Sequence, residues 1–198
     1  MSPEATPEDP GAGRRAVFLD RDGVLNRANV VDGVPHPPAS LAELELLPGV
    51  KDACRRLDDA GLLLIVVTNQ PDVARGTQTI DAVDALNREL AARLPLDEIR
   101  VCPHDDADEC DCRKPAPGML IDAAREHGIE LAKSVMVGDR WRDVEAGRRA
   151  GCKTVFVAAG YSERPPEAPD LTVRDLGEAV PWILDLQLEG QPENADSR

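Results

Sequence analysis

Two aspartates stand at the end of a short apolar segment near the N-terminus, where residues 16–23 read AVFLDRDG. Four apolar residues before a turn signal predict a buried parallel strand, and open α/β sheets bind ligands outside the carboxyl ends of their strands. The carboxylates of Asp20 and Asp22 would repel each other there unless a cation or a shared proton relieves them. Because oxygen ligands suit Mg²⁺, the pair predicts a magnesium site. Taken alone, the pattern also fits a strand followed by an Asp-Gly turn.

Two further segments supply groups that could bind a phosphoryl oxygen. In LLLIVVTNQ, residues 62–70, an apolar strand ends in Thr68 and Asn69, whose hydroxyl and amide can donate hydrogen bonds. Arg113 and Lys114 follow later in the chain; a lysine neutralises a phosphoryl group as a point charge, and an arginine clamps two oxygens. Taken alone, the first segment also fits an ordinary strand end, and the second also fits a solvated basic pair.

A third apolar strand ends in an acidic residue. Residues 135–143 read VMVGDRWRD, so Asp139 follows this strand as Asp20 follows the first one. We expect Asp139 to share the metal with Asp20. Asp143 falls in the first turn of the next predicted helix, where an acid suits the helix dipole. For Asp143, structural support is therefore favoured slightly over metal ligation.

Three thiols and one imidazole lie within 11 residues, at Cys102, His104, Cys110 and Cys112. This set suits a tetrahedral structural Zn²⁺, and a site with four protein ligands is closed to chemistry. Buried free cysteines are the alternative, but the surrounding residues are mostly acidic, as expected of an exposed loop. The loop continues into the basic pair, so the metal would position these two cations.

The elements that must position these groups alternate along the chain. Apolar segments predict strands at 16–20, 62–68, 98–102, 134–138 and 153–158. Helical periodicity, with Thr79 as an N-cap, Pro117 near a helix start and Gly128 at a helix end, predicts helices at 49–60, 79–94, 117–127 and 141–150. This order predicts an α/β fold: a Rossmann-like parallel sheet with helices on both faces and no large cap domain.

The length of 198 residues suits one domain, expected at 15–186, with a zinc loop at 102–112. The polar segments 1–14 and 187–198 are expected to be disordered tails. Because aromatic residues make up 3% of the chain, the core must be aliphatic. Residues 26–48 are irregular and follow the aspartate pair directly, so they are either a surface loop or a loop that recognises the substrate.

The formal net charge of −14 argues against nucleic acid or an anionic membrane as a partner. A small phosphorylated metabolite is still allowed, because screening lets local cations dominate inside a pocket. The start of the chain has no apolar signal segment, and the longest apolar run, 62–67, is too short to span a bilayer. We therefore expect a cytoplasmic protein, and a monomer. Cys54 and Cys152 read as small apolar residues.

The ordered motifs DRDG, VVTNQ, CRKP and GDR resemble those of the haloacid dehalogenase superfamily of phosphatases, over nearly the whole predicted domain. With CPH and CDC added, the chain resembles one subfamily. It contains the D-glycero-D-manno-heptose 1,7-bisphosphate 7-phosphatases and the histidinol-phosphate phosphatases. The segments NQ at 69–70, ARG at 74–76 and PGM at 117–119 favour the heptose enzymes. The short zinc loop is also seen in histidinol phosphatases.

This resemblance implies a two-step hydrolysis of a phosphomonoester. Asp20 would attack phosphorus and form an aspartyl-phosphate. Asp22 would protonate the leaving oxygen and then deprotonate the water that cleaves the intermediate. Mg²⁺ would be held by Asp20, by the backbone carbonyl of Asp22 and by Asp139.

The resemblance also implies the groups that bind the substrate. Thr68 and Lys114 would bind the phosphoryl oxygens as charge builds on them. Arg113 would contact the rest of the substrate, and Asn69 and Arg140 complete the expected substrate-binding set. The expected reaction is removal of the 7-phosphate of the heptose bisphosphate. Histidinol phosphate or another small phosphomonoester, transfer of the phosphoryl group to an alcohol, and a zinc-stabilised binding protein without catalysis are the alternatives.

Overall fold

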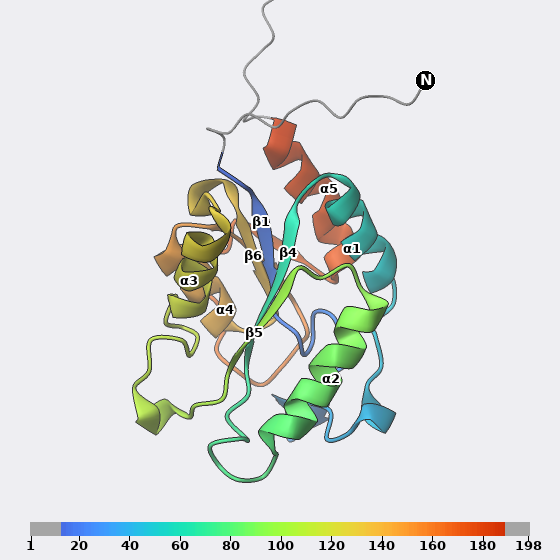
Figure 1. Ribbon diagram of the computed structural model, residues 1–198, viewed down its shortest axis with the longest axis vertical. Helices are drawn as coiled ribbons and strands as arrows, with labels where there is room; N and C mark the ends of the chain where they lie inside the picture. The colour runs from blue at the N-terminus through green and yellow to red at the C-terminus, as the bar shows by residue number, and fades with distance from the viewer. Residues whose placement is uncertain (1–12, 189–198) are drawn as a thin grey trace, which may run out of the picture.

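Six parallel strands form the centre of the protein in the computed structural model, which describes residues 13–188 (Figure 1). The strands are β1 (Ala16–Leu19), β4 (Leu63–Asn69), β5 (Glu98–Cys102), β6 (Val135–Gly138), β7 (Lys153–Val157) and β8 (Leu171–Val173). Their order in the sheet is β5-β4-β1-β6-β7-β8. The predicted α/β class and parallel sheet are confirmed, and the five predicted strands lie within two residues of their expected bounds.

The central strand β1 pairs with a parallel strand on each edge. It is buried on both faces because helices cover the sheet on both sides. Val17 and Leu19 point into one aliphatic core, and Ala16 and Phe18 point into the other. This alternation follows from the two-residue period of a strand. A strand buried on both faces reads as a continuous apolar run, which is why β1 is recognisable in the sequence.

Helices cover both faces of the sheet (Figure 1). Residues of α1 (Val50–Asp59), α2 (Ile80–Arg93) and α5 (Leu176–Leu188) pack into the first core. Residues of α3 (Gly118–His127) and α4 (Trp141–Ala150) pack into the second. Short 3₁₀ helices occupy Leu41–Glu43, Asp106–Asp108 and Leu131–Lys133.

Two of the predicted helix boundaries have the expected chemistry. The Thr79 side chain accepts a hydrogen bond from the Ala82 backbone N–H at 3.2 Å, so Thr79 is the N-cap of α2. Gly128 ends α3 in the left-handed conformation, with φ of 67°. Pro117 precedes the first helical residue of α3 and is its N-cap.

The segment expected as an irregular loop contains a small antiparallel hairpin. Strand β2 (Asn29–Val31) pairs with β3 (Val34–His36) through a turn at Asp32 and Gly33. Both turn residues have positive φ, 52° and 77°, as a type I′ hairpin turn requires. The Asp-Gly pair between valines was the available signal for this hairpin. The hairpin lies directly after the Asp20–Asp22 segment, so it stands beside the candidate site.

The C-terminal part of the domain adds β8 and α5, which the sequence analysis did not predict. Pro181 lies inside α5 and masks the helical signal, but Leu176, Val180 and Ile183 are buried in the first core. Regular structure also reaches slightly beyond the expected domain limits, because the Arg14 backbone pairs with residues 128 and 130 and α5 runs to Leu188. The rest of the two expected tails lies outside the described residues.

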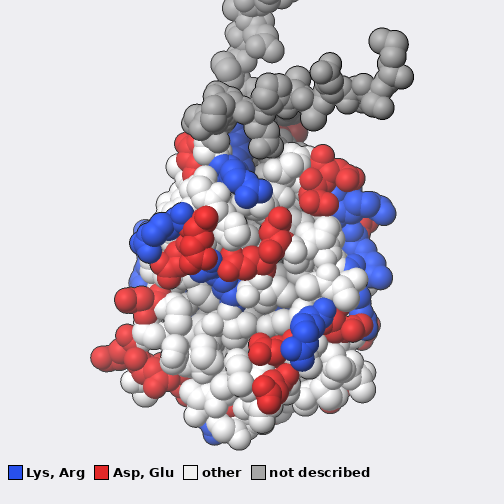
Figure 2. Space-filling model, viewed as in Figure 1, with Lys and Arg blue, Asp and Glu red and all other residues white. Residues whose placement is uncertain are grey.

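Charged side chains lie on the surface as mixed pairs. Figure 2 shows Lys and Arg beside Asp and Glu over the face seen in Figure 1. Examples are the exposed pair of Arg27 with Glu45 and that of Arg93 with Glu89. Within residues 13–188, no helix combines the length and the apolar character needed to cross a bilayer.

Candidate active site

The carboxyl ends of three adjacent strands meet at one edge of the sheet. Asp20 directly follows β1, Thr68 is the second-last residue of β4, and Asp139 directly follows β6. Because β4 and β6 flank β1, these three side chains come together at one edge of the sheet, as the sequence predicted. Asp20, Thr68 and Asp139 are all buried there. The site is therefore built at the ends of three adjacent central strands of the sheet.

Lys114 reaches this edge from the loop that precedes α3. Its ammonium group lies 2.7 Å from Asp20 Oδ1 and 2.6 Å from Asp143 Oδ1, and it donates to the Val67 carbonyl at 2.7 Å. Although burial opposes the charged form, the negative charges of Asp143 and Asp20 raise the pKa of Lys114. The lysine is thus a buried cation held among carboxylates.

Asn69 contributes to the placement of this lysine. Its side-chain Nδ2 donates to the Lys114 carbonyl at 2.9 Å, and its Oδ1 accepts from the Lys114 backbone N–H at 3.1 Å. Asn69 was expected to bind substrate. In the structure both polar atoms of its amide hold the Lys114 peptide, and the residue also lines the adjoining pocket.

Asp20, Asp139 and Asp143 form a compact acidic cluster, with one oxygen of each within 4.8 Å of the others. Burial raises the pKa of Asp20 from 3.8 to about 6, with Lys114 opposing the shift and Asp143 adding to it. Burial, followed by the charge of Asp20, raises the pKa of Asp139 well above its usual value. Three buried carboxylates around one ammonium group leave an excess of negative charge.

A divalent cation fits this cluster. Asp139 is 2% exposed, yet neither of its carboxylate oxygens has a partner with full hydrogen-bond geometry among the described residues, and only the Tyr161 hydroxyl is close enough to influence it as a donor. Buried polar atoms are nearly always paired, so these oxygens mark a place for a cation. An all-oxygen donor set suits Mg²⁺. Asp143 belongs to the same cluster, but its Oδ2 also accepts from the Arg140 backbone N–H at 2.9 Å, which supports the start of α4.

Gly23 allows the Asp139 carboxylate to approach the loop after β1. A Cβ atom at this position would lie 1.8 Å from Asp139 Oδ2, and the backbone φ of 92° is itself unfavourable for other residues. The Tyr161 hydroxyl lies on the same side, 2.7 Å from that Cβ position. Gly23 and Tyr161 were not predicted as site residues.

Asp22 lies beside the acidic cluster within a hydrogen-bonded network. Asp22 Oδ2 accepts from Arg21 Nη2 at 2.9 Å and from Gln70 Nε2 at 2.8 Å, and its Oδ1 accepts from Asn26 Nδ2 at 2.9 Å. Gln70 Nε2 also lies 3.0 Å from Thr68 Oγ1. The network therefore connects the carboxylate of Asp22 to the hydroxyl of Thr68.

Arg21 is the largest fully buried side chain of the described chain. Besides Asp22, its guanidinium donates to Asn87 Oδ1 of α2 at 2.9 Å. Sequence reasoning missed Arg21, Asn26, Gln70 and Asn87. A charged residue between two aspartates was the only available signal, because the burial of the other three arises from the tertiary packing.

A pocket of about 210 Å³ opens over Asp20, Asp22, Thr68 and Lys114. The β2–β3 hairpin forms part of its wall through residues 34–37. The pocket is thus lined by the groups expected to handle a phosphoryl group on one side and by a short hairpin on the other. No domain-sized lid covers it within residues 13–188.

Arg113 and Arg140, which were expected to bind substrate, line this pocket, and each is held by an acidic residue. Arg113 Nε donates to Asp106 Oδ1 at 2.8 Å, and its Nη1 donates to the His104 carbonyl at 3.1 Å. Arg140 Nε donates to Glu163 Oε2 at 2.9 Å. Both guanidinium groups therefore arrive at the pocket already paired.

Arg75 and Arg142, which were not predicted, also line the pocket. Arg75 binds Asp105 through two hydrogen bonds of 2.7 and 2.8 Å, and Arg142 donates to Asp106 at 3.1 Å. Asp105 and Asp106 belong to the cysteine-rich loop. This loop therefore carries the anchors of three arginines at the pocket mouth.

Cys102, His104, Cys110 and Cys112 converge in one cluster. Cys112 Sγ lies 3.2 Å from Cys102 Sγ and 3.3 Å from both Cys110 Sγ and His104 Nδ1. The remaining Cys102 contacts, to Cys110 and His104, are 3.7 Å. Two sulfur ligands of one tetrahedral zinc lie about 3.8 Å apart. The four groups therefore fit a closed zinc site, and all three thiols are free.

An aspartate after the central strand, polar groups after both neighbouring strands and a buried lysine among them match the motifs of one class of proteins. In agreement, a family model described as HAD-hydrolase-like matches residues 111–179. The fold and the site define the chain as a HAD-like hydrolase.

Comparison with known proteins narrows this class. The chain is 40% identical over 193 residues to the D-glycero-D-manno-heptose-1,7-bisphosphate 7-phosphatase of Thermosynechococcus vestitus, covering 86% of this chain and 95% of that protein. It is 39% identical to the corresponding β-anomer phosphatase of Yersinia pestis, with 73% and 81% covered. The chain therefore belongs to the family of D-glycero-D-manno-heptose-1,7-bisphosphate 7-phosphatases.

A solved structure supports the same assignment. The D,D-heptose 1,7-bisphosphate phosphatase of B. bronchiseptica, crystallised with magnesium and phosphate, is 33% identical and superimposes with a TM-score of 0.72. The match covers 86% of this chain and 98% of that one.

Proposed function

We propose that this protein is a magnesium-dependent phosphatase that removes the 7-phosphate of D-glycero-D-manno-heptose 1,7-bisphosphate. The observation that carries the proposal is the buried contact of Lys114 with Asp20, at the edge where Thr68 and Asp139 also lie. The substrate assignment is supported by relatives that are named for this reaction and that this chain matches over most of their length.

In the first step, an Asp20 oxygen attacks phosphorus and the bond from phosphorus to the sugar oxygen breaks. Asp22 gives its proton to the departing sugar oxygen. In the second step, a water molecule attacks the aspartyl-phosphate and gives its proton to Asp22. The bond from Asp20 to phosphorus then breaks, and inorganic phosphate leaves.

The groups around these two aspartates stabilise the charge that builds on the phosphoryl oxygens. Lys114 supplies a fixed positive charge, and Thr68 supplies a hydroxyl whose oxygen already accepts from Gln70. The hydroxyl hydrogen of Thr68 is thereby free to donate to a phosphoryl oxygen. Gln70 and Arg21 orient Asp22, because both donate to its carboxylate.

Asp20, Asp139 and the Asp22 backbone carbonyl would hold Mg²⁺, with Asp143 beside them. The cation supplies charge neutralisation between the carboxylates and the phosphate. Its fit rests on the unpaired oxygens of Asp139 and on the negative excess of the cluster.

The arginines at the pocket mouth suit the second phosphate of a bisphosphate. Arg75, Arg113, Arg140 and Arg142 all line the pocket, and each is paired with an acidic residue of the protein. A distal phosphate would exchange with these exposed or half-exposed carboxylates. Because surface ion pairs are weak, this exchange costs little free energy.

The cysteine-rich loop is proposed to hold one structural Zn²⁺ through Cys102, His104, Cys110 and Cys112. With four protein ligands, the ion has no open position for substrate. Its role would be to fix the loop that anchors the arginines. Thiols that must stay reduced to bind zinc favour a cytoplasmic location.

The test is phosphate release with Mg²⁺ from both anomers of heptose 1,7-bisphosphate, beside histidinol phosphate. We expect one heptose anomer to be preferred about a hundredfold in kcat/KM, or roughly 2.7 kcal/mol of transition-state binding. A preference for histidinol phosphate would overturn the substrate assignment. Asp20→Asn is nearly isosteric and should abolish turnover, whereas near wild-type turnover would overturn the covalent mechanism.

A further inference from the structure

The segment 158–165, called the strap below, follows β7. It contacts the β2–β3 hairpin and the start of α4, and it lies beside the acidic cluster. The Ser162 backbone N–H donates to the Gly33 carbonyl in the hairpin turn at 2.9 Å. Glu163 pairs with Arg140, which precedes α4. Through these contacts the strap is tied to both walls of the candidate site.

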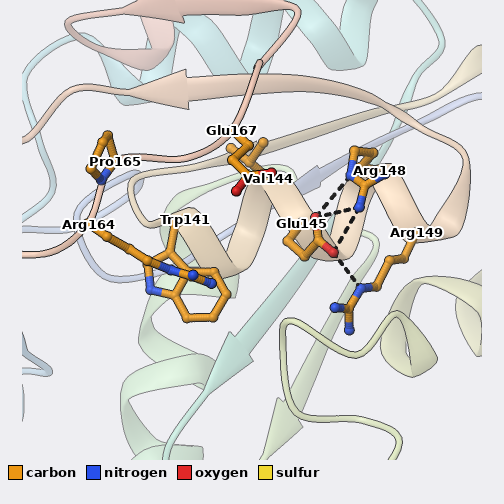
Figure 3. A pocket seen from close by; sticks show the side chains of 8 residues that line it. All are labelled: Trp141, Val144, Glu145, Arg148, Arg149, Arg164, Pro165 and Glu167. Carbon is orange, nitrogen blue, oxygen red and sulfur yellow. Dashed lines mark hydrogen bonds and ion pairs between the residues drawn. The ribbon is translucent and has the colours of Figure 1, made fainter.

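A stacking contact also fixes the strap on the first turn of α4. The guanidinium of Arg164 lies 3.6 Å from the centroid of the Trp141 ring, and Figure 3 shows the two side chains lying against each other. A cation over a tryptophan face at this distance is attracted to the ring. The three residues that directly follow Tyr161 are therefore anchored.

Tyr161 brings its hydroxyl to the acidic cluster. The hydroxyl oxygen and Asp139 Oδ2 both lie within 3 Å of the position of the missing Gly23 Cβ atom, at 2.7 and 1.8 Å. Tyr161 and Asp139 also line one cavity of about 210 Å³, which is separate from the pocket over Asp20. The phenol and Asp139 thus share a cavity that Asp20 does not line.

The buried carboxylate of Asp139 needs a hydrogen-bond donor. Its two oxygens are buried and lack a partner with hydrogen-bond geometry among the described residues. A cation held with Asp20 would engage one oxygen and leave the other unpaired. Carboxylates that ligate metals are normally hydrogen-bonded by a second group, and loss of such a group typically weakens metal binding 10- to 100-fold.

We propose that Tyr161 is a positioning residue for the metal site: its hydroxyl donates to one oxygen of Asp139 and directs the other toward Asp20. The inference rests on the proposed magnesium dependence, but not on the identity of the sugar. Tyr161 does not touch substrate, and its effect is exerted through Asp139.

The chain contains one tyrosine, so incorporation of 3-fluorotyrosine places a single ¹⁹F probe at this site. We expect Mg²⁺, added without substrate, to shift the ¹⁹F resonance along a saturating curve. The shift should vanish in Asp139→Asn. A resonance that does not move when Mg²⁺ binds would overturn the proposal.

Tyr161→Phe removes only the hydroxyl. We expect it to bind Mn²⁺, followed by electron paramagnetic resonance as a substitute for Mg²⁺, about 10- to 100-fold more weakly. At saturating metal, the KM for p-nitrophenyl phosphate should be unchanged and kcat largely restored. Wild-type Mn²⁺ affinity in Tyr161→Phe would overturn the positioning role.

Ser162→Ala is the matched control, because it alters the neighbouring strap residue while keeping the backbone donor to Gly33. It should retain wild-type Mn²⁺ affinity; an equal loss would assign the effect to the strap as a whole and overturn the role of the hydroxyl. Metal binding is measured without substrate, so a wrong heptose assignment leaves these results intact. Failure of the Tyr161 test likewise leaves the hydrolysis assay intact.

Discussion

Lys114 Nζ lies 2.7 Å from Asp20 Oδ1, although 94 residues separate the two in the sequence. The same ammonium group contacts Asp143 at 2.6 Å, so one cation neutralises part of a buried acidic cluster. Strands β1 and β4, helix α4 and the loop before α3 must be in place for the contacts of Lys114 to form. Lys114 therefore couples the integrity of the fold to the chemistry of the site.

Lys114→Met should damage both activity and stability. It removes the cation that would bind the phosphoryl group, and loss of one such group typically lowers kcat by about 10²- to 10³-fold. It also leaves buried carboxylates unpaired, which costs about 3 kcal/mol in the free energy of unfolding. Steady-state kinetics and urea unfolding measure the two effects. Lys133→Met removes an exposed lysine paired with Glu130 and should change neither; unchanged stability in Lys114→Met would show that the buried pair is not needed.

The pH dependence should follow Asp20. Nucleophilic attack requires its carboxylate, and its pKa is about 6 in the folded protein. At subsaturating Mg²⁺, kcat/KM should therefore fall as the pH drops through about 6, and saturating Mg²⁺ should move this limb to lower pH because the cation favours the carboxylate. If the acid limb of the pH profile does not move when Mg²⁺ is added, Asp20 is not a ligand of the metal.

The same shift has a definite sign for stability. The pKa of Asp20 is raised from 3.8, so the folded state holds more protons than the unfolded state between about pH 4 and 6. The contribution of Asp20 to stability must then decrease as the pH rises through this window. In EDTA, Asp20→Asn should gain stability relative to the wild type from pH 4 to pH 6. A constant difference would contradict the raised pKa.

Gly23→Ala should disrupt the metal site through a steric clash. The new methyl group would lie 1.8 Å from Asp139 Oδ2, which must then move. Gly151 has a similar φ of 85° with nothing within 4 Å of its Cβ position, so Gly151→Ala carries the backbone strain without the clash. Backbone strain should cost each variant about 1–2 kcal/mol of stability, and the clash adds to this cost in Gly23→Ala. Calorimetric Mg²⁺ titration should show weaker binding in Gly23→Ala alone; equal affinity in both variants would exclude the clash.

Cys110→Ser should release zinc and loosen the mouth of the pocket. Asp105 and Asp106 anchor three arginines, so loss of the loop should raise KM for a bisphosphate more than it lowers kcat. Cys152 lies outside the cluster, and Cys152→Ala should keep its zinc. Metal analysis of both purified variants, with kinetics on a bisphosphate and a monophosphate, tests this. Full zinc content in Cys110→Ser would rule out the four-ligand site.

The sequence alone determined the parallel sheet and the meeting of Asp20, Thr68 and Asp139. Buried parallel strands are continuous apolar runs, and their carboxyl ends share one edge, so polar residues that end such runs must converge. The close spacing of Cys102, His104, Cys110 and Cys112 was likewise sufficient to predict that the four side chains cluster, because a short loop keeps its side chains near one another. Strand β8 and helix α5 were missed because β8 is short and Pro181 interrupts the helical pattern.

Only the tertiary structure decided which partners surround these groups. Asn69 turns to the Lys114 peptide, Arg140 pairs with Glu163, and Tyr161 reaches Asp139 from a different strand connection. These contacts join residues far apart in the chain, and their energies depend on burial, which follows from how the layers pack. A local pattern of residue types carries no information on such packing. The strand ends were therefore readable in the sequence, whereas the groups that orient them emerged only from the folded chain.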